Sequence, residues 1–516
     1  MHPTKSDQIR VTLSPASDLG IPDNNGNQRH LTLVFMAPVI PSTELNPYHT
    51  NWPKIILWLA NLLSAIKQLM RIALTLLIAC PFAVDGAAVT FNKDIAPIIY
   101  HNCSPCHRPG EAAPFSLLSY DDVAKKSATI AKVTGKRLMP PWKAEPASYS
   151  YRDDRRLNEN EIALIQQWVK AGKPEGDPAD KPEPPKFASG WQLGEPDLIV
   201  EMPAAYHVPP DGPDIYRNIA VPMGLTEDKW LTAIVMKPSA RAVVHHVLYF
   251  ADPNGKIHEK PQQGSEPGFS GMRVGNGAMG IGGWAVGGQP HFYPAGLGLH
   301  LKKGSDLVVQ YHFHPTGKPE AEKSLIGLYF AKKPPERTLT RIQMPPHYSL
   351  FSGLDIPAGD KDFVLRDSFT LPVAIDGVGV SSHAHYIAKQ MKMIATLPTG
   401  EVKTLLYITD WDFAWQDAYY FKDFVSLPKG TRLDAEIHWD NSADNPHNPS
   451  SPPVRVTWGE ESKDEMGSIS LLAVAQEESE LPILRKDVNE HQREIVRSRM
   501  TSDPAFAQKV REMFAE

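Results

Sequence analysis

The chain has 516 residues, which is too long for one hydrophobic core and predicts about three domains. Its 53 Lys and Arg against 59 Asp and Glu give a formal net charge of -6. This balance argues against a nucleic-acid partner, because nucleic-acid-binding proteins carry a basic surface. The 48 Pro and 35 Gly favour short strands and turns over long helical bundles.

The first segment with a clear pattern is an apolar leader. Residues 70–88 have a positive start, an apolar run and small residues at the end, which is typical of a secretory signal peptide. We therefore expect an exported protein, periplasmic or extracellular, and interpret residues 1–69 as an extension without a domain. Two alternatives stay open: a lipid anchor at Cys80, or a single membrane anchor over 55–84.

A haem-attachment pattern follows the leader. The C-x-x-C-H spacing of Cys103, Cys106 and His107 supplies two thiols for the haem vinyl groups and an axial imidazole. Met139, in a later loop, is the predicted sixth ligand, the alternative being a core position. Residues 89–175 are therefore predicted to form a small all-α cytochrome c domain that carries covalent haem c.

Two features mark the end of this domain. Residues 159–171 place apolar side chains at helical spacing, which predicts a closing helix. Residues 176–190 belong to a stretch rich in Pro and charge, which predicts a linker. After the linker the sequence changes to short β-type runs separated by Gly and Pro, which predicts β-sandwich domains.

Histidines gather at three places in these β-type runs. They are the adjacent pair His245 and His246, the pair His312 and His314, and the pair His383 and His385. Side chains two apart on a strand share a face, so an H-x-H pair can bind one metal ion. The adjacent pair needs a bend or a bulge to do the same. Imidazole suits Cu, Zn, Fe or Ni, so this pattern alone leaves the metal open.

The order of motifs over about 195–475 resembles the type II, ascorbate-dependent copper monooxygenases, which include peptidylglycine alpha-hydroxylating monooxygenase and dopamine beta-monooxygenase. The motifs that carry the resemblance are His245-His246, Gln310-Tyr311-His312, His383-Ala384-His385 and Asp464-Glu465-Met466. The resemblance implies two jelly-roll-like β-sandwich domains, over 191–336 and 337–476, and two copper ions.

The resemblance also implies the ligands of each copper. One ion would be held by His245, His246 and His312, and the other, where O2 reacts, by His383, His385 and Met466. Whether His312 or His314 completes the first set stays open, and Gln310 is expected close to it. Two positions depart from the peptide enzyme, which has Arg and Tyr where this chain has Ser381 and Ser470, so peptidylglycine is not the expected substrate.

Together these features predict an exported copper- and haem-dependent monooxygenase that inserts one oxygen atom of O2 into a C–H bond of a small molecule. Electrons would come from an ascorbate-like reductant or a redox protein, pass through the haem to the first copper, and then reach the second. Residues 477–516 are predicted to form a helical tail. The alternative is a non-enzymatic electron-transfer or copper-binding protein, and a third interpretation is zinc at the histidines.

Overall fold

The computed structural model describes residues 60, 67, 88–111, 113–187, 190–271, 274, 277–504 and 506–508. Almost all of the predicted extension and leader, including Cys80, lies outside these residues. In the described part of the chain, no helix has both the length and the apolar character needed to cross a bilayer.

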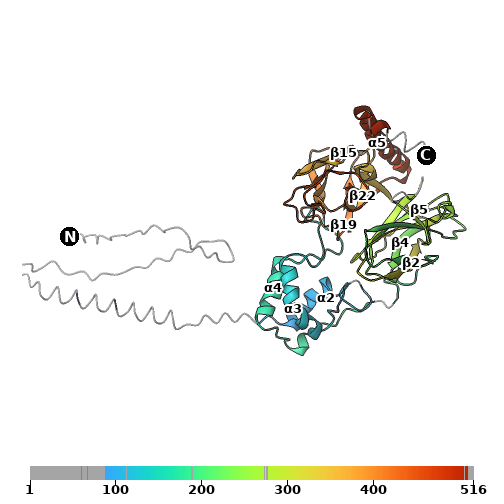
Figure 1. The fold of residues 1–516 in the computed structure, drawn as a ribbon. Coiled ribbons are helices and arrows are strands. Elements are labelled where there is room, and N and C mark those ends of the chain that lie inside the picture. Colours follow the sequence, from blue (N-terminus) through green and yellow to red (C-terminus); the bar gives the residue numbers. More distant parts are fainter. Residues whose placement is uncertain are drawn as a thin grey trace, which may run out of the picture. The chain divides into compact units, whose positions relative to one another are not determined.

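The first described segment is helical and has its own core (Figure 1). Its helices are η1 (Phe91–Ile95), α2 (Ala96–Asn102), α3 (Tyr120–Gly135) and α4 (Glu159–Lys170). Helix α4 matches the predicted closing helix, and it begins at a capping box made by Asn158 and Glu161. Ile165 and Trp168, one turn apart on α4, are buried in this core. Apolar burial on one face therefore holds the helices together.

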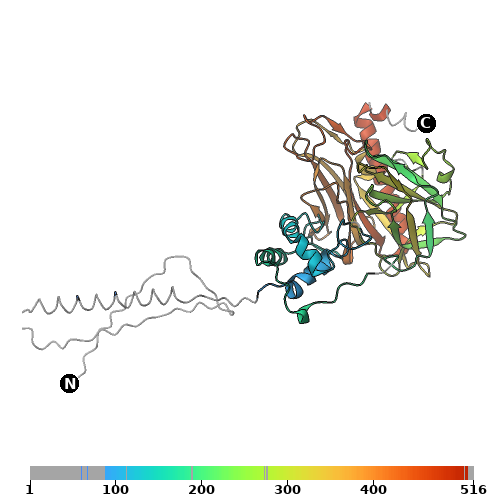
Figure 2. The ribbon, with the colours of Figure 1, turned by 60° about the horizontal axis from the view of Figure 1, so that its bottom comes forward.

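The next residues form a β-sandwich of two five-stranded antiparallel-rich sheets (Figures 1 and 2). One sheet has the order β1 (Leu198–Glu201), β11 (Leu325–Phe330), β4 (Lys229–Lys237), β8 (Leu297–Leu301) and β12 (Arg337–Thr338). The other has the order β6 (Phe269–Ser270), β3 (Ile215–Pro222), β9 (Asp306–Phe313), β5 (Val244–Asp252) and β7 (Met279–Ala285). A small pair, β2 (Tyr206–Val208) and β10 (Glu320–Glu322), lies beside them.

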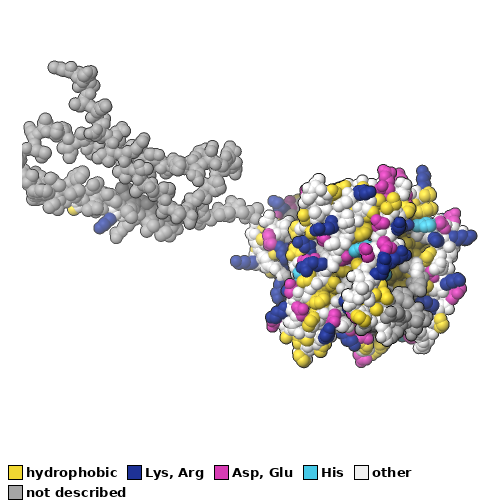
Figure 3. All heavy atoms as spheres, turned by 90° about the horizontal axis from the view of Figure 1, so that it is seen from above, with side chains coloured by type: hydrophobic (Ala, Val, Ile, Leu, Met, Phe, Trp, Pro, Cys, Tyr) yellow, Lys and Arg dark blue, Asp and Glu magenta, His cyan; other side chains and the backbone are white. Residues whose placement is uncertain are grey.

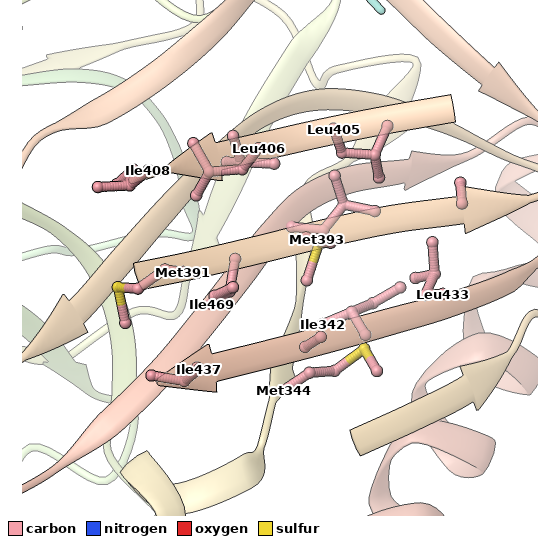
Figure 4. Close-up of a cluster of buried hydrophobic side chains, with 14 of the residues drawn as sticks. Ile342, Met344, Met391, Met393, Leu405, Leu406, Ile408, Leu433, Ile437 and Ile469 are labelled. Carbon is pink, nitrogen blue, oxygen red and sulfur yellow. The ribbon is translucent and has the colours of Figure 1, made fainter. Parts of the chain in front are cut away.

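A second β-sandwich follows, with two four-stranded sheets. One has the order β13 (Thr340–Met344), β22 (Gly467–Ala475), β16 (Ile375–Ala384) and β19 (Ala418–Leu427). The other has the order β15 (Phe363–Thr370), β20 (Arg432–Trp439), β17 (Ala388–Thr396) and β18 (Val402–Ile408), and β14 (Asp355–Ile356) pairs with β21 (Val456–Thr457). Met391, Met393 and Ile437 meet Ile469 in the core between the sheets (Figure 4). This architecture confirms the predicted β-sandwich character.

One sheet of the second sandwich packs on both sides. Along β22, Ile469 and Leu471 point into the core of their own sandwich, whereas Leu472 and Val474 pack against the core of the first. The alternation of a β-strand explains this division, because successive side chains leave opposite faces. Strand β16 pairs with β22, so its side chains also divide between the two faces.

A segment that the sequence pattern assigned to the helical part packs on the second sandwich instead. Ala144 forms a β-bridge with Ile408 at the edge strand β18, and Tyr151 forms one with Phe421 at the edge strand β19. The Tyr151 hydroxyl donates a hydrogen bond to the backbone oxygen of Leu405 at 2.7 Å. Residues 144–152 therefore run from the edge of one sheet to the edge of the other.

The remaining elements are short 3-10 turns and a long helix at the end of the described chain. The turns are η2 (Pro178–Asp180), η3 (Ile257–Glu259), η4 (Pro346–Ser349) and η5 (Glu478–Glu480), and the helix is α5 (Leu481–Ser502). Leu481 and Leu484 anchor α5 by burial. On the face in Figure 3, acidic and basic side chains are interspersed, so this face shows no continuous basic surface.

Candidate metal centre

A β-bulge brings the first histidines together. Val244 pairs with Phe313 and His246 pairs with His312, so that His245 is an extra residue on β5. A bulge bends the strand and redirects the inserted side chain. It allows two adjacent histidines to turn to one place, which a regular strand would prevent, and this is the bulge that the sequence argument required.

The first histidine group, His245, His246 and His312, presents three Nδ1 atoms to one point. The Nδ1 atom of His245 lies 3.0 Å from that of His246 and 3.2 Å from that of His312, and the third distance is 3.3 Å. The centre of this triangle lies about 1.8 Å from each nitrogen, and metal–imidazole bonds are about 2.0 Å long, so an ion fits just above the plane. Within the described residues, it is the only set of three or more His, Cys, Asp or Glu side chains whose ligand atoms are this close together.

Burial favours the neutral form of His245 and His246. Burial lowers the pKa of His245 to about 4, and burial with the adjacent imidazoles lowers the pKa of His246 well below its ordinary range. A neutral imidazole has a free lone pair on one ring nitrogen, which metal binding requires.

Asp214, in the loop before β3, separates His312 from His314. Its Oδ2 atom lies 2.9 Å from Nε2 of His312, and its Oδ1 atom lies 2.7 Å from Nδ1 of His314. Burial alone would raise the pKa of Asp214, but its contacts with His312, His314 and Ser462 lower it below the ordinary range. The His314 side chain is 61% exposed, so the structure includes His312 in the first group and leaves His314 outside it. No sequence motif pointed to Asp214.

Gln310 lies on β9 two residues before His312, on the same face of the strand. It is buried, and its Nε2 atom donates a hydrogen bond to Oδ1 of Asn218 at 2.9 Å. Its described bond is therefore to the neighbouring strand β3.

The second histidine group, His383 and His385, lies where β16 ends. In the antiparallel pairing of β16 with β22, His383 is opposite Ser468 and Ala384 is opposite Gly467. Strand β16 ends at Ala384 and β22 begins at Gly467, so His385 and the buried Met466 are the residues next to this last pair.

Hydrogen bonds fix the orientation of both rings in the second group. Nδ1 of His383 donates to Oε1 of Gln416 at 2.6 Å, and Nδ1 of His385 donates to the backbone oxygen of Asp464 at 3.1 Å. Nε2 of His383 is buried and has no hydrogen-bond partner among the described residues. Burial lowers the pKa of His383 to about 4 and that of His385 to about 3. The buried Nε2 atom of His383 is thus available for a metal ion.

Glu465 holds the segment that carries this methionine. Its carboxylate is buried and accepts hydrogen bonds from the backbone N–H groups of His385, Ile387 and Met466 and from Nε1 of Trp439, at 2.8 to 3.2 Å. Burial raises the pKa of Glu465 to about 8, although these four bonds oppose the increase. The second acidic residue of the Asp-Glu-Met motif is thus a structural link between β22 and the end of β16.

The two histidine groups face each other. The ring centroids of His246 and His383 lie 6.3 Å apart. The Phe413 ring lies between the groups, with its centroid 5.0 Å from that of His245 and 5.8 Å from that of His385. Two sites from separate sandwiches therefore adjoin one aromatic side chain.

A cavity of about 230 Å³ borders both groups. His246 and His383 contribute to its wall, together with the partly exposed apolar residues Leu248 and Trp284. Such a space accommodates a small molecule next to the histidines.

The C-x-x-C-H motif forms a turn after α2. Cys103 follows the end of α2, both thiols are free of disulfides, and Nδ1 of His107 donates to the backbone oxygen of Phe115 at 3.2 Å. This bond leaves Nε2 of His107 available as an axial ligand. Met139 is half-buried. Its backbone N–H donates to the backbone oxygen of Val133, which ties this residue to the end of α3.

The turn also contacts the first sandwich. The Cys106 sulfur lies 3.9 Å from the backbone oxygen of Gly287 and 3.8 Å from Nε2 of Gln289. Both residues belong to the loop that follows β7, and Ala285 at the end of β7 pairs with His246. One short loop therefore joins the cysteine motif to the first histidine group.

Comparisons with known proteins show a distant similarity, and no model of a known protein family matches the chain. Over 192 residues the chain is 25% identical to DBH-like monooxygenase protein 1 of Gallus gallus, which covers 34% of this chain and 30% of that protein. The Homo sapiens protein of the same name is 26% identical over 195 residues, with the same coverage. Among solved structures, the cowpea mosaic virus top component covers 54% of this chain and 90% of its own at 7% identity, but its TM-score of 0.24 is too low for any structural argument. The chain is thus similar, over about a third of its length, to DBH-like monooxygenase protein 1.

Proposed function

We propose that this protein is a copper-dependent monooxygenase that inserts one oxygen atom of O2 into a C–H bond of a small molecule. The observation that carries the proposal is the meeting of two histidine groups at one cavity, with His246 and His383 in its wall. The distant similarity to DBH-like monooxygenase protein 1 supports the same class of reaction.

The donor atoms differ between the two groups in a way that suits two roles. The first group offers three imidazole nitrogens, and the second offers two imidazoles and the thioether of Met466. Thioethers favour Cu(I), and a site with two imidazoles and one weak thioether keeps a coordination position free. Copper, when bound, supplies one-electron transfer and O2 activation, and the second group is the expected place of the reaction.

The protein's own side chains prepare these sites. Asp214 and Gln416 fix the rings of His312 and His383 through the nitrogen that faces away from the ion, as carboxylates and amides do in other metal sites. Phe413 covers both groups with an apolar face and limits the access of water to them. The cavity then positions the substrate beside His383.

We propose further that residues 89–175 bind haem c through Cys103, Cys106 and His107, with Met139 as the sixth ligand, and pass electrons to the coppers. The contacts of Cys106 support this route. At Gly287, which touches the Cys106 sulfur, an added Cβ would lie 3.3 Å from the Trp415 ring, and the next residue, Gln416, binds His383. A continuous set of contacts thus connects the thioether position to the second histidine group.

The proposal includes the remaining assignments made from the sequence. Residues 191–336 and 337–476 form the two copper domains, the residues after them form a helical tail, and the leader exports the protein to the oxidising compartment in which haem c is attached. An external reductant or redox protein supplies the electrons.

Incubation with labelled O2 tests the reaction. Products formed from a panel of small organic molecules are expected to contain one labelled atom, and His385→Ala is expected to abolish both incorporation and O2 consumption by the reduced, copper-loaded protein. If O2 consumption is equal in His385→Ala and the parent protein, the monooxygenase proposal is wrong, and the non-enzymatic electron-transfer alternative is favoured.

The cofactors are tested separately. Protein isolated from its native host should gain the mass of one haem, and it should lose covalent haem when Cys103 and Cys106 are both replaced by Ser. Metal analysis should give two copper ions per chain and a Cu(II) EPR signal. Two equivalents of zinc without that signal would contradict the copper assignment.

A further inference from the structure

Paired residues of β16 and β22 form the floor of the cavity beside the histidines. Across β16 and β22, His383 is opposite Ser468, Ser381 is opposite Ser470, and Gly379 is opposite Leu472. Each row is two residues from the last, so all of these side chains leave the same face of the sheet. The rows therefore form a path that starts at the second histidine group.

Small side chains leave space along the middle of this path. Ser381, Ser470 and Ala418 line the cavity, and Ala418 is the partner of Ser381 on β19. The opposite wall comes from the first sandwich and combines apolar residues, Leu248 and Trp284, with His291. A narrow molecule with an apolar body fits between this wall and the floor.

The far end of the path is positively charged. Arg341 on β13 is the partner of Leu472 on β22, which places it four residues beyond Ser468 and thus about 13 Å along the sheet from the His383 row. Arg152 lies at the same end. Its backbone N–H donates to the backbone oxygen of Tyr420, and Tyr420 pairs with Gly379, the partner of Leu472. Both arginines line the cavity.

Among the described residues, these two guanidinium groups, those of Arg341 and Arg152, have no hydrogen-bond or ion-pair partner. The third arginine of the cavity, Arg155, differs, since its guanidinium is 2.6 Å from Asp417. The remaining carboxylate, Asp153, is 68% exposed and lies 3.9 Å from His291. The end of the cavity therefore keeps an excess of positive charge.

From this arrangement we propose that the substrate is a small carboxylic acid with an apolar chain. Its carboxylate binds Arg341 and Arg152, and its chain lies over Ser470 and Ser381 toward His383. A guanidinium fork matches the two oxygens of a carboxylate, which gives both orientation and preference for an anion. The inference rests on the proposed monooxygenase function and adds the substrate class to it.

Calorimetric titration tests the proposal without turnover. The probes are 4-phenylbutanoate and 6-phenylhexanoate, each compared with its primary amide, and the protein is the full chain without reductant. We expect each acid to bind about tenfold more tightly than its amide. Arg341→Gln should remove most of this preference, and Arg341→Lys should retain part of it. The matched control is Arg455→Gln, which removes a guanidinium that pairs with Asp355 away from the cavity and should leave the preference unchanged.

The outcomes separate this proposal from the proposed function. Equal binding of acids and amides, binding of none of the probes, or a preference that survives in the Arg152→Gln, Arg341→Gln double variant would overturn the carboxylate assignment. If acids bind as expected but no labelled oxygen enters any product, the substrate-binding site stands and the monooxygenase function fails. If labelled oxygen enters amides as readily as acids, the function stands and the carboxylate assignment fails.

Discussion

Replacement of Asp214 by Asn tests how the first histidine group is held. The carboxylate contacts Nε2 of His312 at 2.9 Å and Nδ1 of His314 at 2.7 Å, and it accepts a hydrogen bond from Ser462 at 2.8 Å. The negative charge beside Nε2 of His312 favours the tautomer with its proton on Nε2, which leaves the Nδ1 lone pair facing the other two imidazoles. The amide of Asn has a similar shape but carries no charge and can present a donor to Nε2, so the favourable tautomer of His312 loses its support.

Loss of such an outer partner typically reduces metal affinity about 10- to 100-fold, which corresponds to about 1.4 to 2.8 kcal/mol. We expect a decrease of this size for the first copper and none for the second. Titration of the copper-free protein with Cu(II) against a competing chelator would resolve the two binding events.

Two further variants define the result. His314→Ala removes an exposed partner of the same carboxylate and should change the first affinity by less than about fivefold. Asp228→Asn removes the carboxylate that contacts His300 at 2.7 Å, outside both groups, and should have no effect on either copper. The reasoning is refuted if Asp214→Asn binds both coppers like the parent protein, or if His314→Ala weakens the first copper as much as Asp214→Asn does.

Three other predictions follow from buried contacts. Glu465→Ala leaves four buried donors without an acceptor, so it should destabilise the copper-free protein by about 3 kcal/mol or more. The melting temperature should fall by at least about 6 °C. The control Asp444→Ala, at an exposed ion pair, should change the stability by less than about 1 kcal/mol. Gln416→Ala removes the acceptor of a ring N–H in the second histidine group and should weaken only the second copper, about 10- to 100-fold in a chelator titration; Gln476→Ala, with its amide bonded elsewhere, should not. Tyr151→Phe removes one buried hydrogen bond and should cost about 1 kcal/mol in denaturant unfolding; an unchanged midpoint would show that the bridging segment contributes nothing through that hydroxyl.

Local patterns in the sequence predicted much of the fold and part of the site. Short β-type runs bounded by Gly and Pro predicted strands such as β9 and β11, and helical spacing of apolar residues predicted α4. Strand geometry also showed that His245 and His246 could bind one metal ion only if the strand had a bend or a bulge. Strand β5 has such a bulge. In each case the information lies within one element or one pair of adjacent residues.

Other parts of the site depend on contacts between distant segments and had no sequence signal. Asp214, Gln416 and Phe413 stand in ordinary loops, and only the folded chain brings them to the histidines. The segment 144–152 is a similar case, because its partners lie on β18 and β19, more than 250 residues away along the chain. A hydrogen bond formed across such a separation leaves no periodic pattern in either segment.

The loop after β7 changes how the proposed electron route is understood. The sequence argument ordered the carriers as haem, first copper, second copper. In the structure, the same loop contacts Cys106 and leads to each histidine group separately. Toward the first group, Ala285 pairs with His246 in the sheet. Toward the second group, Gly287 lies close to Trp415, and the next residue, Gln416, accepts a hydrogen bond from His383. Neither path passes through the other group, so under the proposed electron route the second copper would receive electrons without the first. A variant without the first copper, such as His245→Ala with His246→Ala, should then still reoxidise its haem in the presence of copper and O2, and haem that stays fully reduced in this variant would restore the sequential order.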